Sequence, residues 1–139
     1  MGDGAFAQAT AGTMMEALGM VVEVAERERV RIRMPVDHRT RQPFGLLHGG
    51  ASVALAETAA SLGTMLNIDG AREVAVGIEI NANHIRAKRD GQVVGEAVPL
   101  HRGRRTIVWD IRITDEEDRL IAVSRCTVAV VPRRRDSDS

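Results

Sequence analysis

Residues 48–67 read HGGASVALAETAASLGTMLN, and this stretch decides the fold. It is rich in alanine and leucine and contains no proline, a composition that predicts a helix. Gly49 and Gly50 open the predicted helix, which closes near residues 67–70. A surface helix would carry a charged face, and this one carries almost no charge, so we expect it to be buried nearly all round.

Strand-like segments lie on both sides of this helix. Residues 19–35 alternate well enough to form two short strands joined near residues 26–29, and residues 5–17 before them are moderately helical. After the helix come four further strand-like runs, separated by turn signals: residues 73–86, 92–101, 104–114 and 119–131. Strands without intervening helices pair antiparallel. The sequence therefore predicts an α+β fold, in which a curved antiparallel sheet of five to six strands wraps one long central helix.

Chain length sets the domain organisation. The chain has 139 residues, the size of one domain, and 44% of them are hydrophobic. We expect residues 1–139 to form a single domain, with an N-terminal extension or helix start in residues 1–15 and a disordered tail in residues 133–139. Aromatic residues make up only 2% of the chain, so its core must be mainly aliphatic.

Composition also excludes several classes of function. A formal net charge of zero argues against a nucleic-acid-binding protein. One cysteine, Cys126, allows no intramolecular disulfide or cysteine-based zinc cluster, and we expect it to be buried and unreactive. The histidines lack metal-ligand spacing, so no metal is expected. The N-terminus lacks signal-peptide features, and residues 45–66 are too polar for a membrane span, which favours a cytoplasmic protein without a membrane partner.

Glu57 is the anomaly of the helix. Between Pro43 and Ile68 only His48 and Glu57 can ionise, and the helical neighbours of Glu57 are small or apolar. An unpaired buried carboxylate is costly, so it needs a partner, a proton or a function. Two interpretations remain open: a structural acid bonded to buried backbone or to Ser61, and a functional acid.

The start of the same helix offers a complementary group. The N–H groups of Gly49 and Gly50 have no partner within the helix, and the helix dipole makes this end positive, so an oxyanion could be stabilised there. Gly49 and Glu57 are eight residues apart, or about 12 Å along a helix axis. If both serve one reaction, Glu57 must work with the helix start of another subunit, which predicts an oligomer with shared sites.

Three stretches of the chain resemble a known family in combination. They are QPFGLLHGGASVALAETAASLG (42–63), VGIEINANHIR (76–86) and PLHRGRRTIVWDIRI (99–113). Over roughly residues 15–131 the chain resembles the hotdog-fold acyl-CoA thioesterases. The nearest group is that of the 4-hydroxybenzoyl-CoA and 1,4-dihydroxy-2-naphthoyl-CoA thioesterases, which is similar to the phenylacetate-pathway thioesterases. The resemblance implies a homo-oligomer assembled as a dimer of dimers.

The resemblance also implies roles for individual residues. Glu57 matches the carboxylate that attacks the thioester carbonyl or activates water, and Gly49 matches the backbone donor that polarises this carbonyl. Gln42 and His48 match polar groups that position the thioester and the water or leaving thiolate. The residues expected to contact the substrate are Ser61, His84 and Gly50. The candidates for binding the coenzyme A portion are Arg86, Arg102, Arg104 and Arg105, although the Gly-Ser-Arg-like turn of close relatives reads Gly103-Arg104-Arg105 here. Coenzyme A is part of the substrate, so no cofactor is expected.

His84 ends a long alternating run. The alternation predicts one buried face that continues to the rim of a pocket, formed by Val74, Val76, Ile78, Ile80, Ala82 and His84.

The function expected from the resemblance is hydrolysis of an aromatic acyl-CoA to the free acid and coenzyme A. Rival functions are an acyl-CoA dehydratase of the same fold, a non-catalytic acyl-CoA- or hydrophobe-binding protein, a medium-chain or carrier-protein thioesterase, and a structural oligomer.

Overall fold

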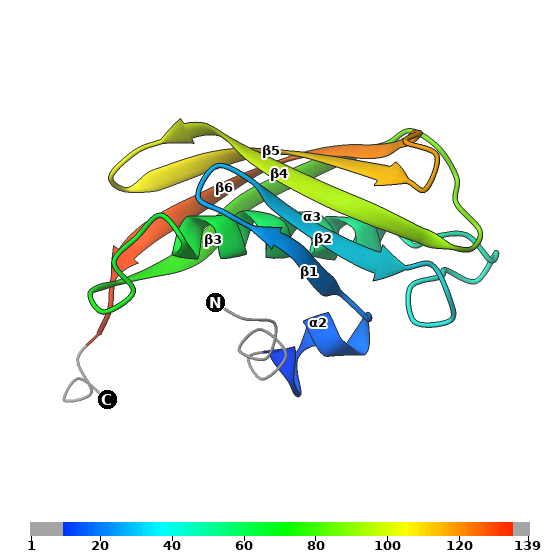
Figure 1. The fold of residues 1–139 in the computed structure, drawn as a ribbon, viewed down its shortest axis with the longest axis horizontal. Coiled ribbons are helices and arrows are strands. Elements are labelled where there is room, and N and C mark those ends of the chain that lie inside the picture. Colours follow the sequence, from blue (N-terminus) through cyan, green and yellow to red (C-terminus); the bar gives the residue numbers. More distant parts are fainter. Residues whose placement is uncertain (1–9, 135–139) are drawn as a thin grey trace.

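The computed structural model describes residues 10–134 and shows one long helix against a six-stranded sheet (Figure 1). All neighbouring strands are antiparallel, in the order β1-β2-β4-β5-β6-β3. The predicted order of elements is confirmed. The elements are α2 (Met14–Ala17), β1 (Val21–Ala25), β2 (Val30–Pro35), α3 (Gly49–Met65), β3 (Glu73–His84), β4 (Gln92–Arg102), β5 (Thr106–Asp115) and β6 (Leu120–Pro132).

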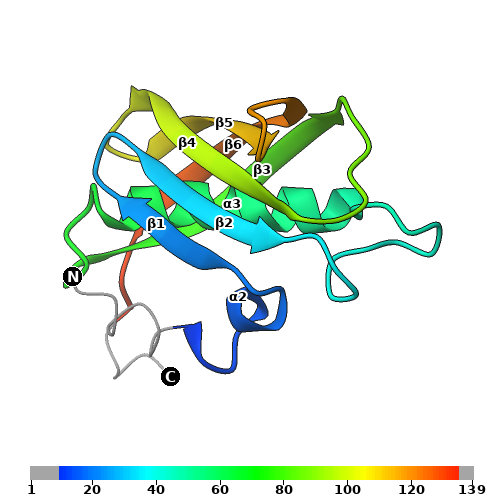
Figure 2. The same ribbon diagram turned by 45° about the vertical axis from the view of Figure 1, so that its right-hand side comes forward.

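The sheet curves over α3, so the predicted α+β hotdog architecture is confirmed (Figures 1 and 2). Five strands, β2 to β6, contact the helix. As the low aromatic content predicts, the core between sheet and helix is mainly aliphatic. Its largest fully buried side chains are Trp109, Ile32, Met34, Leu55, Ile111 and Ile113.

Trp109 fixes the distance between the helix and the sheet. The indole Nε1–H of this β5 residue donates a 2.9 Å hydrogen bond to Oγ1 of Thr64 on α3. Its ring also lies against Gly63, where a Cβ atom would overlap it. Because both contacts are buried, α3 can approach the sheet here only with glycine at position 63.

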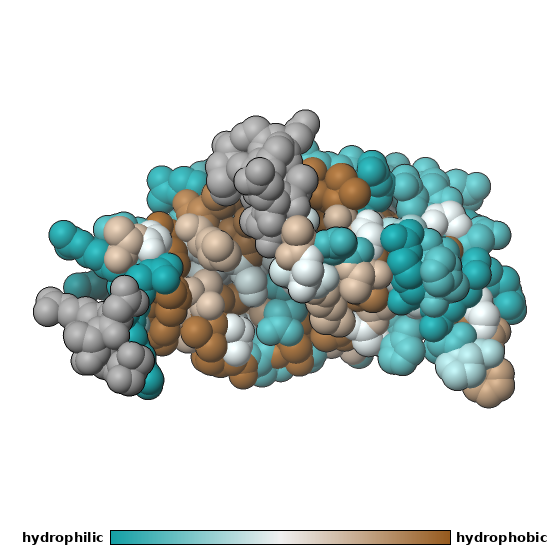
Figure 3. Space-filling model, turned by 90° about the horizontal axis from the view of Figure 1, so that it is seen from below, coloured by the Kyte–Doolittle hydropathy of each residue, from teal (hydrophilic) through white to brown (hydrophobic). Residues whose placement is uncertain are grey.

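One face of α3 is open in the single chain. The expectation that this helix is buried nearly all round is therefore wrong for the single chain. Leu55, Ala56 and Ala59 are fully buried against the sheet, whereas Glu57 is half-buried and Met65 is exposed on the opposite side. The reason is geometric, because one curved sheet covers only one side of a helix. From below, hydrophobic side chains gather over the middle of the molecule (Figure 3).

A β-bulge divides the alternating run of β3. The register with β6 shifts between Gly77 and Glu79, which leaves Ile78 as an extra residue. Some residues of β3 pair with buried residues of β6 and therefore face the inside of the sheet. They are Ala75, Gly77, Ile80, Ala82 and His84. The predicted single face is therefore wrong for Val74, Val76 and Ile78, because the extra residue reverses the alternation.

The chain ends are described only in part. Of the predicted helix over residues 5–17, the structure shows α2 at residues 14–17, and residues 1–9 lie outside the described part. Of the predicted tail, Arg133 donates hydrogen bonds to the carbonyls of Arg72 and Gly70, and residues 135–139 lie outside. No helix between residues 10 and 134 is long and apolar enough to cross a membrane.

We predict that Gly63→Ala destabilises the protein despite the higher helix propensity of alanine. The propensity gain of about 1 kcal/mol is outweighed by overlap with Trp109, since overpacking a core costs about 1–3 kcal/mol. Urea denaturation followed by the fluorescence of Trp109, the one tryptophan of the chain, measures the change. Gly70→Ala is the control, because a Cβ atom there meets nothing within 4 Å. Equal stabilities of the two variants would contradict the packing argument.

Candidate active site

Glu57 lies on the open face of α3 and lines a cavity of about 680 Å³. The rest of the lining is mostly apolar or small, and includes Val53, Ala54 and Leu62. Within residues 10–134, no hydrogen bond or ion pair engages the carboxylate, and none joins it to Ser61. The described part of the single chain thus offers no partner for a purely structural acid.

Gly77 makes room for this carboxylate. It faces inward from β3, and a Cβ atom on it would overlap Oε1 of Glu57. Any larger residue would push the Glu57 side chain aside. The sequence interpretation missed Gly77, although a glycine inside a strand-like run is a recognised signal of a bulge or a close approach.

The start of α3 has one engaged and one open N–H group. His48 is the N-cap residue, and its Nδ1 accepts a 2.7 Å hydrogen bond from the Gly50 N–H. The Gly49 N–H has no acceptor among the described residues. Gly49 thus retains the donor that its predicted role requires. The His48 ring is placed as a cap, and Gly50 contributes space to the Glu57 cavity rather than a free donor.

Gly49 and His84 lie side by side. A Cβ atom on Gly49 would be 2.9 Å from Nε2 of His84, so the imidazole rests on the helix start. Both residues line a second cavity of about 270 Å³ together with Gln42 and Arg86. We call Gln42, Gly49 and His84 the donor cluster, because each can donate an N–H group.

The loop between β2 and α3 projects from one end of the molecule (Figure 2). Gln42 lies in a tight turn of this loop. Its Oε1 accepts from the Phe44 N–H, and its own N–H donates to the Leu46 carbonyl. Gly45 closes the turn at φ +85°, which favours glycine. The NH₂ group of the Gln42 amide has no acceptor among the described residues and can donate to a ligand.

The predicted site residues form two separate groups in one chain. Gln42, Gly49, His84 and Arg86 share the smaller cavity, whereas Glu57, Ser61 and Gly50 share the larger one. We call Glu57 with Ser61 the acid cluster. The separation of eight positions between Gly49 and Glu57 corresponds to about 12 Å along the continuous helix α3.

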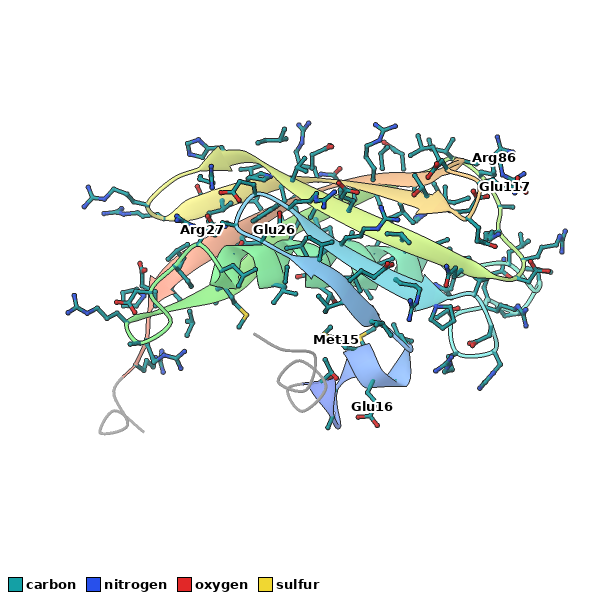
Figure 4. The ribbon with its side chains drawn as sticks, in the orientation of Figure 1. Met15, Glu16, Glu26, Arg27, Arg86 and Glu117 are labelled. Atoms are coloured by element: carbon teal, nitrogen blue, oxygen red, sulfur yellow. The ribbon has the colours of Figure 1, made fainter. Side chains whose placement is uncertain are left out.

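The four predicted arginines are also divided. Arg86 lies just beyond the end of β3 (Figure 4). The other three lie in and after β4, at the opposite end of the sheet. There Arg104 and Arg105 line a further cavity with His101. Arg102 is engaged with Asn67 and Glu28, at 3.3 Å and 3.6 Å.

Cys126 is fully buried on β6, as predicted. Burial raises the pKa of its thiol to about 12, and the negative charges of Glu57 and Glu79 add to this effect. A thiol with such a pKa is protonated at neutral pH and is a poor nucleophile. Among residues 10–134, no group of three or more histidine, cysteine or acidic residues is placed to hold a metal ion.

Comparisons with known proteins find similar sequences and structures over most of the chain. The family model of the thioesterase superfamily matches residues 44–122. ComA2 of Bacillus subtilis (strain 168) is 55% identical over 121 residues, which are 87% of this chain and 96% of that protein. The 1,4-dihydroxy-2-naphthoyl-CoA hydrolase of Escherichia coli (strain K12) is 49% identical over 120 residues, 86% of this chain and 88% of that protein. The crystal structure of a mutant thioesterase from Pseudomonas aeruginosa superposes with a TM-score of 0.92 at 41% identity and covers 96% of both chains.

We predict that Cys126 does not react with a thiol reagent in the native protein. Its pKa of about 12 leaves almost no thiolate at pH 8, and burial blocks access. Titration with Ellman's reagent should show no reaction in buffer and one thiol per chain after denaturation in guanidinium chloride. Rapid modification of the folded protein would contradict the described burial.

Proposed function

This chain belongs to the thioesterase superfamily and is a thioester hydrolase, and from that premise we propose that it cleaves aromatic acyl-CoA with Glu57 as the catalytic carboxylate. In this proposal, each active site combines the acid cluster of one subunit with the donor cluster of another. The observation that carries it is the position of Glu57, whose carboxylate has no described partner and lines an apolar cavity.

The groups of the two clusters suit hydrolysis of a thioester. The Glu57 carboxylate either attacks the carbonyl carbon, giving an anhydride that water then cleaves, or removes a proton from water that attacks directly. On either route the C–S bond breaks, the acyl group gains OH from water, and the coenzyme A sulfur gains the proton. The Gly49 N–H at a helix N-terminus stabilises the oxyanion. Gln42 and His84 hold the thioester, and His48 fixes the helix start.

The β3 edge supports a shared site. β3 lies at the end of the sheet, and its Val76 and Ile78 are 45% and 59% exposed. A long edge strand with exposed apolar residues is a liability unless another chain covers it. We propose that a second copy pairs with β3 in antiparallel fashion, which makes one continuous sheet across the dimer.

The inward residues of β3 suggest a register for this pairing. When the extra residue Ile78 is left out, a two-fold axis at Asn81 places Gly77 of one chain opposite His84 of the other. Because Gly77 lies beside Glu57 and His84 beside Gly49, this register brings the acid cluster to the donor cluster of the second copy. It also brings Arg86 of one chain toward the Arg104–Arg105 turn of the other, where both could bind the coenzyme A phosphates.

Support for an aromatic acyl group comes from the relatives and the cavity. One relative is named 1,4-dihydroxy-2-naphthoyl-CoA hydrolase, and this chain is 49% identical to it. The cavity of about 680 Å³ lies within the usual range of small-molecule sites, about 300–1,000 Å³. A hydrolysis panel of aromatic, short aliphatic and long aliphatic acyl-CoAs tests the proposal through the release of free thiol.

We predict that Glu57→Gln lowers kcat on the best acyl-CoA by at least about 100-fold with little change in KM. Glutamine keeps the size of the side chain and removes the negative charge that the reaction needs. Glu23→Gln is the matched control, because Glu23 is an exposed residue of β1, at the opposite edge of the sheet from β3, and lines neither site cavity. If Glu57→Gln turns over at the wild-type rate, Glu57 is not the catalytic carboxylate.

A cysteine at Asn81 tests the dimer. Directly opposite residues in an antiparallel pair are about 4.5–5.5 Å apart at Cα, within the range that a disulfide spans. Asn81→Cys should therefore give a disulfide-linked dimer under mild oxidation, seen on a non-reducing gel. The control Asn83→Cys should not, since two Asn83 residues would be about 14 Å apart. Native Cys126 is buried and does not interfere. Cross-linking of Asn83→Cys alone would refute this register.

A further inference from the structure

The cavity beside Glu57 has a second wall that does not come from α3. All of its described lining residues outside α3 belong to one short segment, and they are Thr10, Met14 and Met15. The cavity is therefore a gap between two helices, with the carboxylate on one side and methionine side chains on the other.

We propose that Met14 and Met15 determine the acyl specificity of this site, by forming an adaptable wall that accepts uncharged aromatic and medium-length alkyl groups. The inference rests on the proposed function, since it assigns the cavity to the acyl group of the thioester. It adds a role for α2, whose side chains take no part in the chemistry at the carbonyl.

The two methionines suit an adaptable wall. Methionine has an unbranched side chain and a polarisable sulfur, so it can adjust its shape to different apolar groups. Met14 is 61% exposed, and the half-buried Met15 packs against the core. Figure 4 shows Met15 directed from α2 toward the sheet, whereas the neighbouring Glu16 points the other way.

The hydrogen bonds that attach α2 to the rest of the described chain are local, and none reaches the helix that carries Glu57. Gly12 before it and Gly19 after it both have φ +74°, so each end is a sharp glycine turn. The helix is held by local bonds, from the Gly12 N–H to Glu16 and from the Met20 N–H to the Met15 carbonyl. Movement of this wall would change the width of the cavity without displacing α3.

The chemistry of the lining disfavours an anionic acyl group. Within residues 10–134 no lysine, arginine or histidine lines the cavity, and Glu57 contributes a carboxylate. A second carboxylate on the acyl group would be repelled there. The Thr58 hydroxyl already donates to the Ala54 carbonyl, so the wall of α3 offers few polar contacts to a substituent.

The test measures kcat/KM for butanoyl-, benzoyl- and decanoyl-CoA, which share the same coenzyme A portion. The Met14→Ala/Met15→Ala variant should raise the decanoyl-to-butanoyl ratio about tenfold, since even one methylene in an apolar pocket changes kcat/KM about 10–200-fold. Met15→Trp should lower the benzoyl and decanoyl values and leave butanoyl nearly unchanged. Leu100→Ala is the control, because this exposed β4 residue lies outside the cavity, and its ratios should equal those of the wild type.

The outcomes separate the two proposals. If the wild type cleaves none of the three substrates, the proposed function fails. If it cleaves them and the α2 variants keep the wild-type ratios, or lose activity equally on all three, the specificity role of α2 is overturned. Should the double variant fail to fold, Met14→Ala alone decides the question, because this side chain is mostly exposed.

Discussion

The structure depends on how closely α3 packs against the concave face of the sheet. Small residues on its buried side, such as Ala56 and Ala59, allow this approach, and Trp109 sets its limit through Gly63 and Thr64. A helix at this distance leaves no space for a charged side chain on its sheet side. The only carboxylate of α3 must therefore point away from the core, toward the open face.

The same packing explains why β3 is irregular. Glu57 runs beside β3, and the strand accommodates it with a glycine and a bulge at positions 77 and 78. The bulge then turns Ile80, Ala82 and His84 inward, which brings the His84 ring onto Gly49. One local irregularity thus shapes both halves of the candidate site, and it leaves Val76 and Ile78 exposed at the sheet edge.

The division of the site gives each element a separate task in the proposed enzyme. The start of α3 supplies a backbone donor, its middle supplies the carboxylate, and two-fold pairing of β3 would join them. The acyl group is then enclosed by α2, whose hydrogen bonds within the described part of the chain are local and whose Met15 packs against the core. In this arrangement the chemistry belongs to α3 and the specificity to α2, so the two properties lie on separate elements of the chain.

The sequence alone determined the order of helices and strands, the antiparallel sheet, the long helix and the unusual Glu57, because periodicity, turn residues and missing charges are local properties. The fixed geometry of a helix also showed that Gly49 and Glu57 of one chain are too far apart to act on the same thioester. Only the tertiary structure decided which face of α3 is open, that Gly77 lies beside Glu57, that His48 occupies the Gly50 N–H, and that α2 walls the cavity. These features arise where segments distant in sequence meet, and one extra residue in β3 was enough to reverse the predicted face for Val74 and Val76.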